Sequence, residues 1–148
     1  NPSVKQHGEE SVAIKVTEDY VEAVIVIQQA MLDVMQKHHI AIECNPTSNF
    51  RIGEFMKYAA HPLLKFFNYG LDTNYPSHAI PISINTDDSG VFATSVEREY
   101  ALIALSLEKD AEFSKRNPPH AIYDWLDRIR EMLQEQRFYK KEDHRNSL

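Results

Sequence analysis

The chain has 148 residues, 43% of them hydrophobic and 26% charged, which is the composition of one water-soluble globular domain. Its formal net charge of −6 argues against broad binding to nucleic acid, and no apolar run approaches the ~20 residues of a membrane span. The single cysteine excludes an internal disulfide and a cysteine-rich zinc site, so we expect a protein of the reducing cytoplasm with no membrane partner.

The N-terminal segment, residues 1–16, is polar and is predicted to be a loop or an insertion. Because the chain begins with asparagine rather than methionine, we expect a processed chain or a fragment. Thr17 can cap the helix that follows, which carries acidic residues in its favourable first turn. Apolar residues at helical spacing predict that this helix continues to about His38.

A strand is predicted at Ile40–Glu43, after almost no loop, and a helix that leads directly into a strand is typical of α/β folds. Residues 45–49 are predicted to form a loop that is rich in hydrogen-bonding groups. These groups either satisfy their own backbone or shape the floor of a pocket. A short helix is then predicted at Glu54–Ala60, and another opens at Pro62 and ends at Gly70.

The second predicted strand, residues 79–84, places its isoleucines at 80, 82 and 84 on one face because side chains alternate. It runs into two adjacent carboxylates, Asp87 and Asp88. One interpretation is a solvated turn that Ser89 and Gly90 complete. The other is a ligand site, because ligands bind at the carboxyl ends of parallel strands and a metal ion or basic ligand compensates paired charges.

Two longer helices are predicted near the C-terminus. The sequence Thr94–Glu97 fits a capping box, and Asn117-Pro118 supplies a cap and a proline for the start of the last helix. The apolar stripe of that last helix is predicted to contain Ile122, Trp125, Ile129 and Leu133. Residues 140–148 are charged and are predicted to be a frayed polar tail.

Several short motifs resemble, in order and spacing, the C-terminal part of the adenosine deaminase family. They are Glu-Cys-Asn-Pro-Thr-Ser-Asn at 43–49, His-Pro at 61–62 and Asn-Thr-Asp-Asp at 85–88, extended by Phe-Ala-Thr-Ser at 92–95 and Glu-Tyr at 99–100. The resemblance covers about residues 28–107. It implies an α/β fold, namely the C-terminal portion of a (β/α)8 barrel with about two parallel strands and flanking helices, in residues 17–139.

The resemblance also implies a chemistry. Members of this family are zinc hydrolases in which a metal-activated water attacks the purine carbon that bears the amino group, and ammonia leaves. Asp87 matches the aspartate that binds the metal and takes part in catalysis, and Asp88 matches the one that hydrogen-bonds the purine. The expected cofactor is therefore zinc, and the expected substrate is adenosine or a related purine nucleoside.

The sequence also departs from the family pattern. It contains no His-x-His, no His-Ala-Gly-Glu and no Gly-His-Gly segment, each of which supplies metal ligands or catalytic groups in the family. A catalytic zinc usually takes three protein ligands, so we expect an incomplete site that the remainder of the barrel, or a second copy of the chain, accompanies. Two alternatives remain open: a non-catalytic deaminase-like domain for assembly or nucleoside binding, and an unrelated small α/β binding module.

Overall fold

A computed structural model of the chain describes residues 8, 11, 13–53 and 55–136. The chain divides into two compact units, Asn1–Met31 and Leu32–Leu148. The predicted tail at 140–148 and much of the predicted loop at 1–16 lie outside the described residues, so the predicted division of the chain at these points stays a prediction. Within the described part of the chain, none of the helices combines the length and the apolar character that a membrane crossing needs.

The first long helix, α2 (Glu18–Lys37), begins and ends with recognisable caps. The Oγ1 atom of Thr17 accepts a hydrogen bond of 3.2 Å from the backbone nitrogen of Tyr20, as the cap prediction requires. At the other end His39 has a φ of 52°, and the backbone nitrogen of Ile40 donates to the carbonyl of Met35 at 3.0 Å. Ile40 therefore terminates the helix, and the prediction that a strand begins at this residue is wrong.

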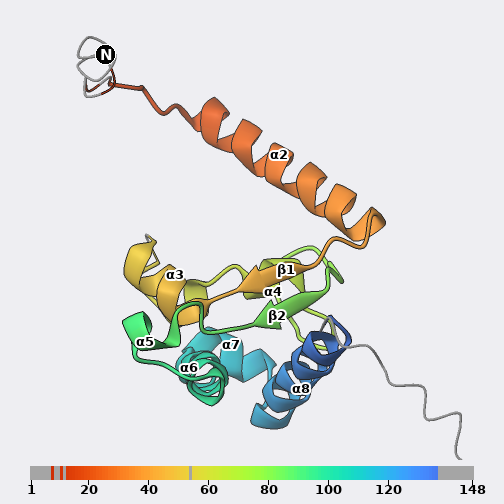
Figure 1. Cartoon of the computed structure of the whole chain (residues 1–148). Coiled ribbons are helices and arrows are strands. Elements are labelled where there is room, and N and C mark those ends of the chain that lie inside the picture. The colour runs from red at the N-terminus through yellow and green to blue at the C-terminus, as the bar shows by residue number, and fades with distance from the viewer. Residues whose placement is uncertain (1–7, 9–10, 12, 54, 137–148) are drawn as a thin grey trace, which may run out of the picture. The chain divides into compact units, whose positions relative to one another are not determined.

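Two short parallel strands lie side by side, although about forty residues separate them along the chain (Figure 1). Strand β1 (Ile42–Cys44) pairs in parallel with β2 (Ile82–Ile84). The backbone nitrogen of Asn85 donates to the carbonyl of Cys44 at 2.9 Å and extends the ladder by one bond. The predicted pair of parallel strands with flanking helices is thereby confirmed, and both strands end at the same edge.

The strand β2 is buried on both of its faces. Ile80, Ile82 and Ile84 are all fully buried, but β2 covers only 82–84 of the strand predicted at 79–84, so Ile80 precedes it. Ser83, which lies between two of them, is only 4% exposed, so the opposite face is covered as well. Burial on both faces is typical of strands in parallel sheets.

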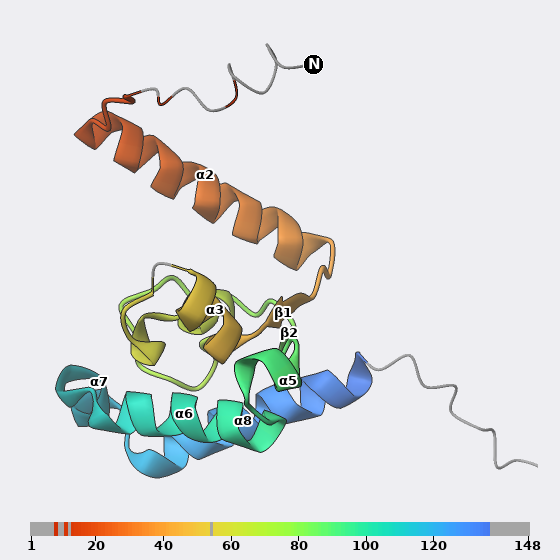
Figure 2. The ribbon, with the colours of Figure 1, turned by 60° about the vertical axis from the view of Figure 1, so that its left-hand side comes forward.

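Three helices gather on one side of the strands in both ribbon views (Figures 1 and 2). They are α6 (Val96–Lys109), α7 (Ala111–Arg116) and α8 (Pro119–Glu135). Helix α8 packs against β2, and α6 packs against both α8 and β2. The core between these elements contains Cys44, Leu63, Leu64, Phe67, Ile82, Ile84, Ile103, Leu107, Phe113, Ile122, Trp125, Leu126 and Ile129.

The segment between the two strands differs most from the prediction. The predicted loop at 45–49 is largely helix α3 (Pro46–Ile52), because Pro46 occupies its first turn, where a missing N–H costs nothing. Residue 54 of the helix predicted at 54–60 lies outside the described residues, and residues 55–60 contain a short 3-10 turn, η1 (Tyr58–Ala60), instead of that helix. Helix α4 (Leu63–Phe66) ends well before Gly70, because extended backbone follows it and forms a bridge to Ala79.

Two predicted helix caps are each wrong by one residue. Ser95, rather than Thr94, caps α6, because its hydroxyl accepts from the backbone nitrogen of Arg98. Asn117 does not cap α8, since its side-chain amide exchanges two hydrogen bonds, of 2.8 and 2.9 Å, with the backbone of Asp72. The short helices α5 (Ser89–Phe92) and α7 were not predicted at all.

Candidate functional site

The first polar contact of interest joins the ends of the two strands, within the unit Leu32–Leu148. The hydroxyl of Ser48, on α3 after β1, donates to Oδ2 of Asp87, after β2, at 2.8 Å. Ser48 is 4% exposed, whereas Asp87 is exposed. Asp87 has a φ of 56°, a left-handed conformation that aspartate tolerates better than most residues. One carboxylate oxygen is therefore held in place by a buried hydroxyl while the side chain reaches solvent.

The neighbouring carboxylate of Asp88 makes a different contact. Its Oδ1 accepts a hydrogen bond of 2.8 Å from the backbone nitrogen of Val91 and caps α5. The local contact of Asp88 agrees with the interpretation of the two aspartates as a turn. Asp87 instead contacts Ser48 on α3. The two consecutive side chains lie against different neighbours, so they are not interchangeable.

A fully buried carboxylate, Glu99 on α6, lies behind this edge of the strands. Its Oε2 accepts from the backbone nitrogen of Thr47 at 2.8 Å, and its Oε1 accepts from the hydroxyl of Thr94. The hydroxyl of Thr47 in turn lies 3.2 Å from that of Tyr58. Glu99 belongs to the Glu-Tyr motif at 99–100, but no role for it is predicted from the sequence. The available signal was its position on the apolar face of α6, four residues before Ile103.

The side chain of His61 is 7% exposed and has a partner on each ring nitrogen. Its Nε2 donates to Oδ1 of Asn49 at 3.0 Å, and its Nδ1 accepts from the backbone nitrogen of Leu63 at 3.3 Å. These contacts require the neutral ring with its proton on Nε2. Burial lowers the pKa of His61 from 6.5 to about 4, which the negative charge of Glu99 opposes.

The lowered pKa of His61 predicts a pH dependence of stability. Because the unfolded chain binds a proton near pH 6.5 and the folded chain only near pH 4, unfolding gains protons in this window. The free energy of unfolding is therefore expected to fall by up to about 3 kcal/mol between pH 6.5 and pH 4, and to level off below. Urea denaturation at a series of pH values measures this.

The variant His61→Gln should remove this part of the pH dependence, whatever its effect on stability at neutral pH. The matched control is His120→Gln on α8, where the histidine is exposed. We expect the control to keep the slope of the original chain. An unchanged slope in His61→Gln would show that His61 does not titrate in this way.

The described residues offer few other metal ligands. Residues 13–53 and 55–136 contain no group of three His, Cys, Asp or Glu side chains that could hold a metal ion. The Cys44 thiol is buried, and burial together with the charge of Glu43 raises its pKa to about 12, so it is protonated at neutral pH. Asp87 is the residue of this chain that is predicted to bind the metal. A single ligand does not fit a complete zinc site.

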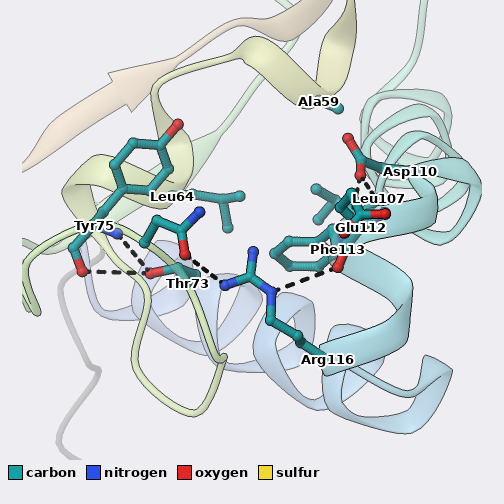
Figure 3. A pocket seen from close by; sticks show the side chains of 10 residues that line it. Ala59, Leu64, Thr73, Tyr75, Leu107, Asp110, Glu112, Phe113 and Arg116 are labelled. Carbon is teal, nitrogen blue, oxygen red and sulfur yellow. Dashed lines mark hydrogen bonds between the residues drawn. The ribbon is translucent and has the colours of Figure 1, made fainter.

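A cavity of about 400 Å³ lies elsewhere, between α6, α7 and the loop before β2 (Figure 3). Arg116 reaches into its rim, where Nη1 donates to Oδ1 of Asn74 at 2.7 Å and Nε donates to the carbonyl of Glu112. Neither Asp87 nor Asp88 lines this cavity. The cavity is therefore separate from the predicted site residues.

Comparison with known proteins agrees with the resemblance of the motifs. The profile of the family described as "Adenosine deaminase" matches residues 7–117. The adenosine deaminase of Plasmodium gallinaceum is 29% identical over 94 residues, which is 63% of this chain and 24% of that protein. The adenosine deaminases of Serratia proteamaculans (strain 568) and Escherichia coli (strain SE11) are each 36% identical, over 75 and 76 residues, or 51% of this chain and 20% of theirs.

The chain thus spans between a fifth and a quarter of the length of these curated relatives. No solved structure matches it significantly. The family match nevertheless covers about three quarters of the chain, including both strands and both aspartates. The chain therefore belongs to the adenosine deaminase family.

Proposed function

We propose that this chain is the C-terminal segment of an adenosine-deaminase-like zinc hydrolase, which removes the amino group of adenosine or a related purine nucleoside. The observation that carries the proposal is the contact between Ser48 and Asp87. It fixes a carboxylate at the carboxyl edge of two parallel strands, where barrel enzymes place their active sites. The membership of the family supplies the reaction type.

Asp87 is proposed as the zinc ligand and as a catalytic residue of this hydrolase. Ser48 holds its Oδ2, and the exposed side chain leaves Oδ1 accessible to a metal ion. Bound zinc would supply a water of lowered pKa as the nucleophile. Asp88 is proposed to hydrogen-bond the purine, since capping α5 engages only its Oδ1.

The remaining ligands would come from a part of the enzyme outside this chain, which we propose to be the remainder of a (β/α)8 barrel. In the described residues β1 and β2 have only each other as partners, so each strand leaves one edge for pairing. The remainder of the barrel or a second copy of the chain would cover these edges. We place this enzyme in the cytoplasm and its deaminase-like part in residues 17–139.

The proposal predicts that this chain alone has no deaminase activity and binds zinc no better than about millimolar. Asp87 is the single strong ligand that it brings, against the three that a catalytic zinc site needs. Calorimetric titration with zinc and a deamination assay with adenosine on the purified chain measure both quantities. The positive control is the proposed full-length enzyme, in which the His-x-His and His-Ala-Gly-Glu segments would accompany this chain.

Each outcome of this comparison distinguishes the candidate functions. Robust turnover by the chain alone would show that the active site lies elsewhere in it. A full-length protein that binds adenosine without converting it would favour the non-catalytic, nucleoside-binding alternative. Zinc-dependent deamination by the full-length protein, and none by the chain, supports the proposal.

A further inference from the structure

We propose that the cavity between α6, α7 and the loop at 73–75 binds an α-amino acid with an apolar side chain. The cavity measures about 400 Å³, and small-molecule sites typically measure ~300–1,000 Å³. It lies within the unit Leu32–Leu148, and neither Asp87 nor Asp88 lines it. A ligand in this cavity would therefore bind apart from the proposed deaminase site, and its binding does not depend on that function.

The floor of the cavity is apolar and is shared by several elements (Figure 3). Leu64 on α4, Leu107 on α6 and Phe113 on α7 line it with buried side chains. The ring of Tyr75, which is 42% exposed, forms another part of the wall. An apolar ligand group that leaves water for such a surface gains free energy, so the floor favours a ligand with an apolar side chain.

Two hydrogen-bond donors are held next to each other at the rim (Figure 3). Nη1 of Arg116 donates to Oδ1 of Asn74 at 2.7 Å. Because a guanidinium group only donates, this bond leaves Nδ2 of Asn74 as a donor toward a ligand. In the described residues the polar contacts of Arg116, including its ion pair of 3.6 Å with the exposed Asp72, involve Nη1 and Nε. Nη2 of Arg116 and Nδ2 of Asn74 together suit a carboxylate, which accepts two hydrogen bonds at once.

A carboxylate lies at the other end of α7. Oδ1 of Asp110 accepts from the backbone nitrogens of Glu112 and Phe113 at 3.1 and 3.0 Å and caps the helix. The cap fixes the side chain of Asp110 but engages only one of its two oxygens. Glu112, which also lines the cavity, is already paired with Lys115 at 2.7 Å. Asp110 is therefore the better partner for an ammonium group of a ligand.

The spacing of the two charged groups follows from one peptide bond, which joins Glu112 to Phe113. Oδ1 of Asp110 lies 3.0 Å from its nitrogen, and Nε of Arg116 lies 3.5 Å from its oxygen. Because these backbone atoms are about 2 Å apart, the two side-chain atoms are at most about 9 Å apart. Hydrogen bonds of about 3 Å at each end leave roughly 3 Å for the ligand. An α-amino acid matches this gap, because one carbon atom joins its ammonium and carboxylate groups.

The test is isothermal titration calorimetry of the purified chain with L-phenylalanine. We expect a Kd of about 1 mM or tighter, which lies within the range that ligands of this size reach. Two analogues serve as comparisons: phenylpropionate lacks the ammonium group, and phenylethylamine lacks the carboxylate. Each should bind at least about tenfold more weakly than L-phenylalanine, since each loses a charged hydrogen bond.

Two variants remove the charged groups of the site one at a time. Arg116→Met removes the donors of the guanidinium group, and Asp110→Asn removes the negative charge but keeps the cap of α7, because asparagine caps a helix as well as aspartate does. Each should weaken the binding of L-phenylalanine at least about tenfold. The matched control is Arg130→Met, which removes an exposed arginine whose ion pair with Asp127 lies within α8, and it should leave the affinity unchanged.

Backbone amide chemical shifts locate the ligand without any variant, and they decide the question should a variant fail to fold. On titration of the unsubstituted chain with L-phenylalanine, the amides of Glu112 and Phe113 should shift, whereas that of Asp87 should not. Absence of binding, shifts at Asp87 instead of at α7, or equal affinity for L-phenylalanine and its two analogues would each overturn the inference. So would a folded Arg116→Met or Asp110→Asn variant that keeps the full affinity.

Discussion

In the proposed full-length enzyme, Asp87→Ala is expected to remove both the bound zinc and the deaminase activity. A catalytic zinc site has only about three protein ligands, so the loss of one carboxylate removes a large part of the affinity. Ser48 would also lose its acceptor for the bond of 2.8 Å. Elemental analysis of the purified variant and steady-state kinetics with adenosine measure the two losses, and thermal denaturation checks that the variant is folded.

Asp88→Asn is the matched comparison, because it changes the adjacent carboxylate by a single atom. Asparagine caps a helix as well as aspartate does, so α5 should keep its bond from Val91. We expect zinc to remain bound and turnover to fall by roughly 5- to 150-fold, the loss of about 1–3 kcal/mol from one charged hydrogen bond to the substrate. If both variants kept zinc and full activity, the two aspartates would form only a turn.

The second large effect is expected on stability. Trp125→Ala should lower the free energy of unfolding by about 3–5 kcal/mol, because removing a buried aromatic side chain leaves a cavity that the surroundings fill only in part. Trp125 is 1% exposed in the core between α8 and the strands, and its Nε1 donates to the carbonyl of Phe67 at 3.0 Å. Urea denaturation of the purified chain measures the loss.

Two further variants test the two contributions of Trp125, the apolar volume that it buries and the hydrogen bond that it donates. Trp125→Phe keeps most of the apolar volume but leaves the carbonyl of Phe67 without its buried donor, which should cost about 1–3 kcal/mol. Tyr123→Ala on the same helix is the control, since this side chain is 50% exposed and should cost about 0.5 kcal/mol or less. Equal losses for Trp125→Ala and Tyr123→Ala would contradict the assignment of Trp125 to the core.

The parts of the fold that depend on local periodicity could be predicted from the sequence. The stripe of α8 recurs at helical spacing, and Ile122, Trp125 and Ile129 are buried as predicted, whereas Leu133 is half-buried. The position of β2 was equally clear, because a short apolar run there ends in polar residues. Both patterns depend only on which side chains are apolar and become buried. They do not depend on which other residues pack against those side chains.

The contacts of the candidate site could not be predicted in the same way. Residues 46–49 at the start of α3 are of types that are common in turns and loops, so the sequence did not indicate a helix there. One partner of Glu99, Thr47, lies 52 positions away in the sequence, and one partner of Asn117, Asp72, lies 45 positions away. Local patterns contain no information on such pairs, and the motif resemblance located Asp87 without its contact to Ser48.

The parallel pairing of β1 and β2 has a consequence for the order of folding. Helices α6 and α8 are close in sequence and can pack early, whereas the two strands must close a loop of about forty residues before any ladder bond forms. The bond from Ser48 to Asp87 spans 39 positions and closes the same loop. We therefore expect the candidate site to form in the last step of folding. Before that step, the helices are formed but Ser48 and Asp87 are not yet in contact.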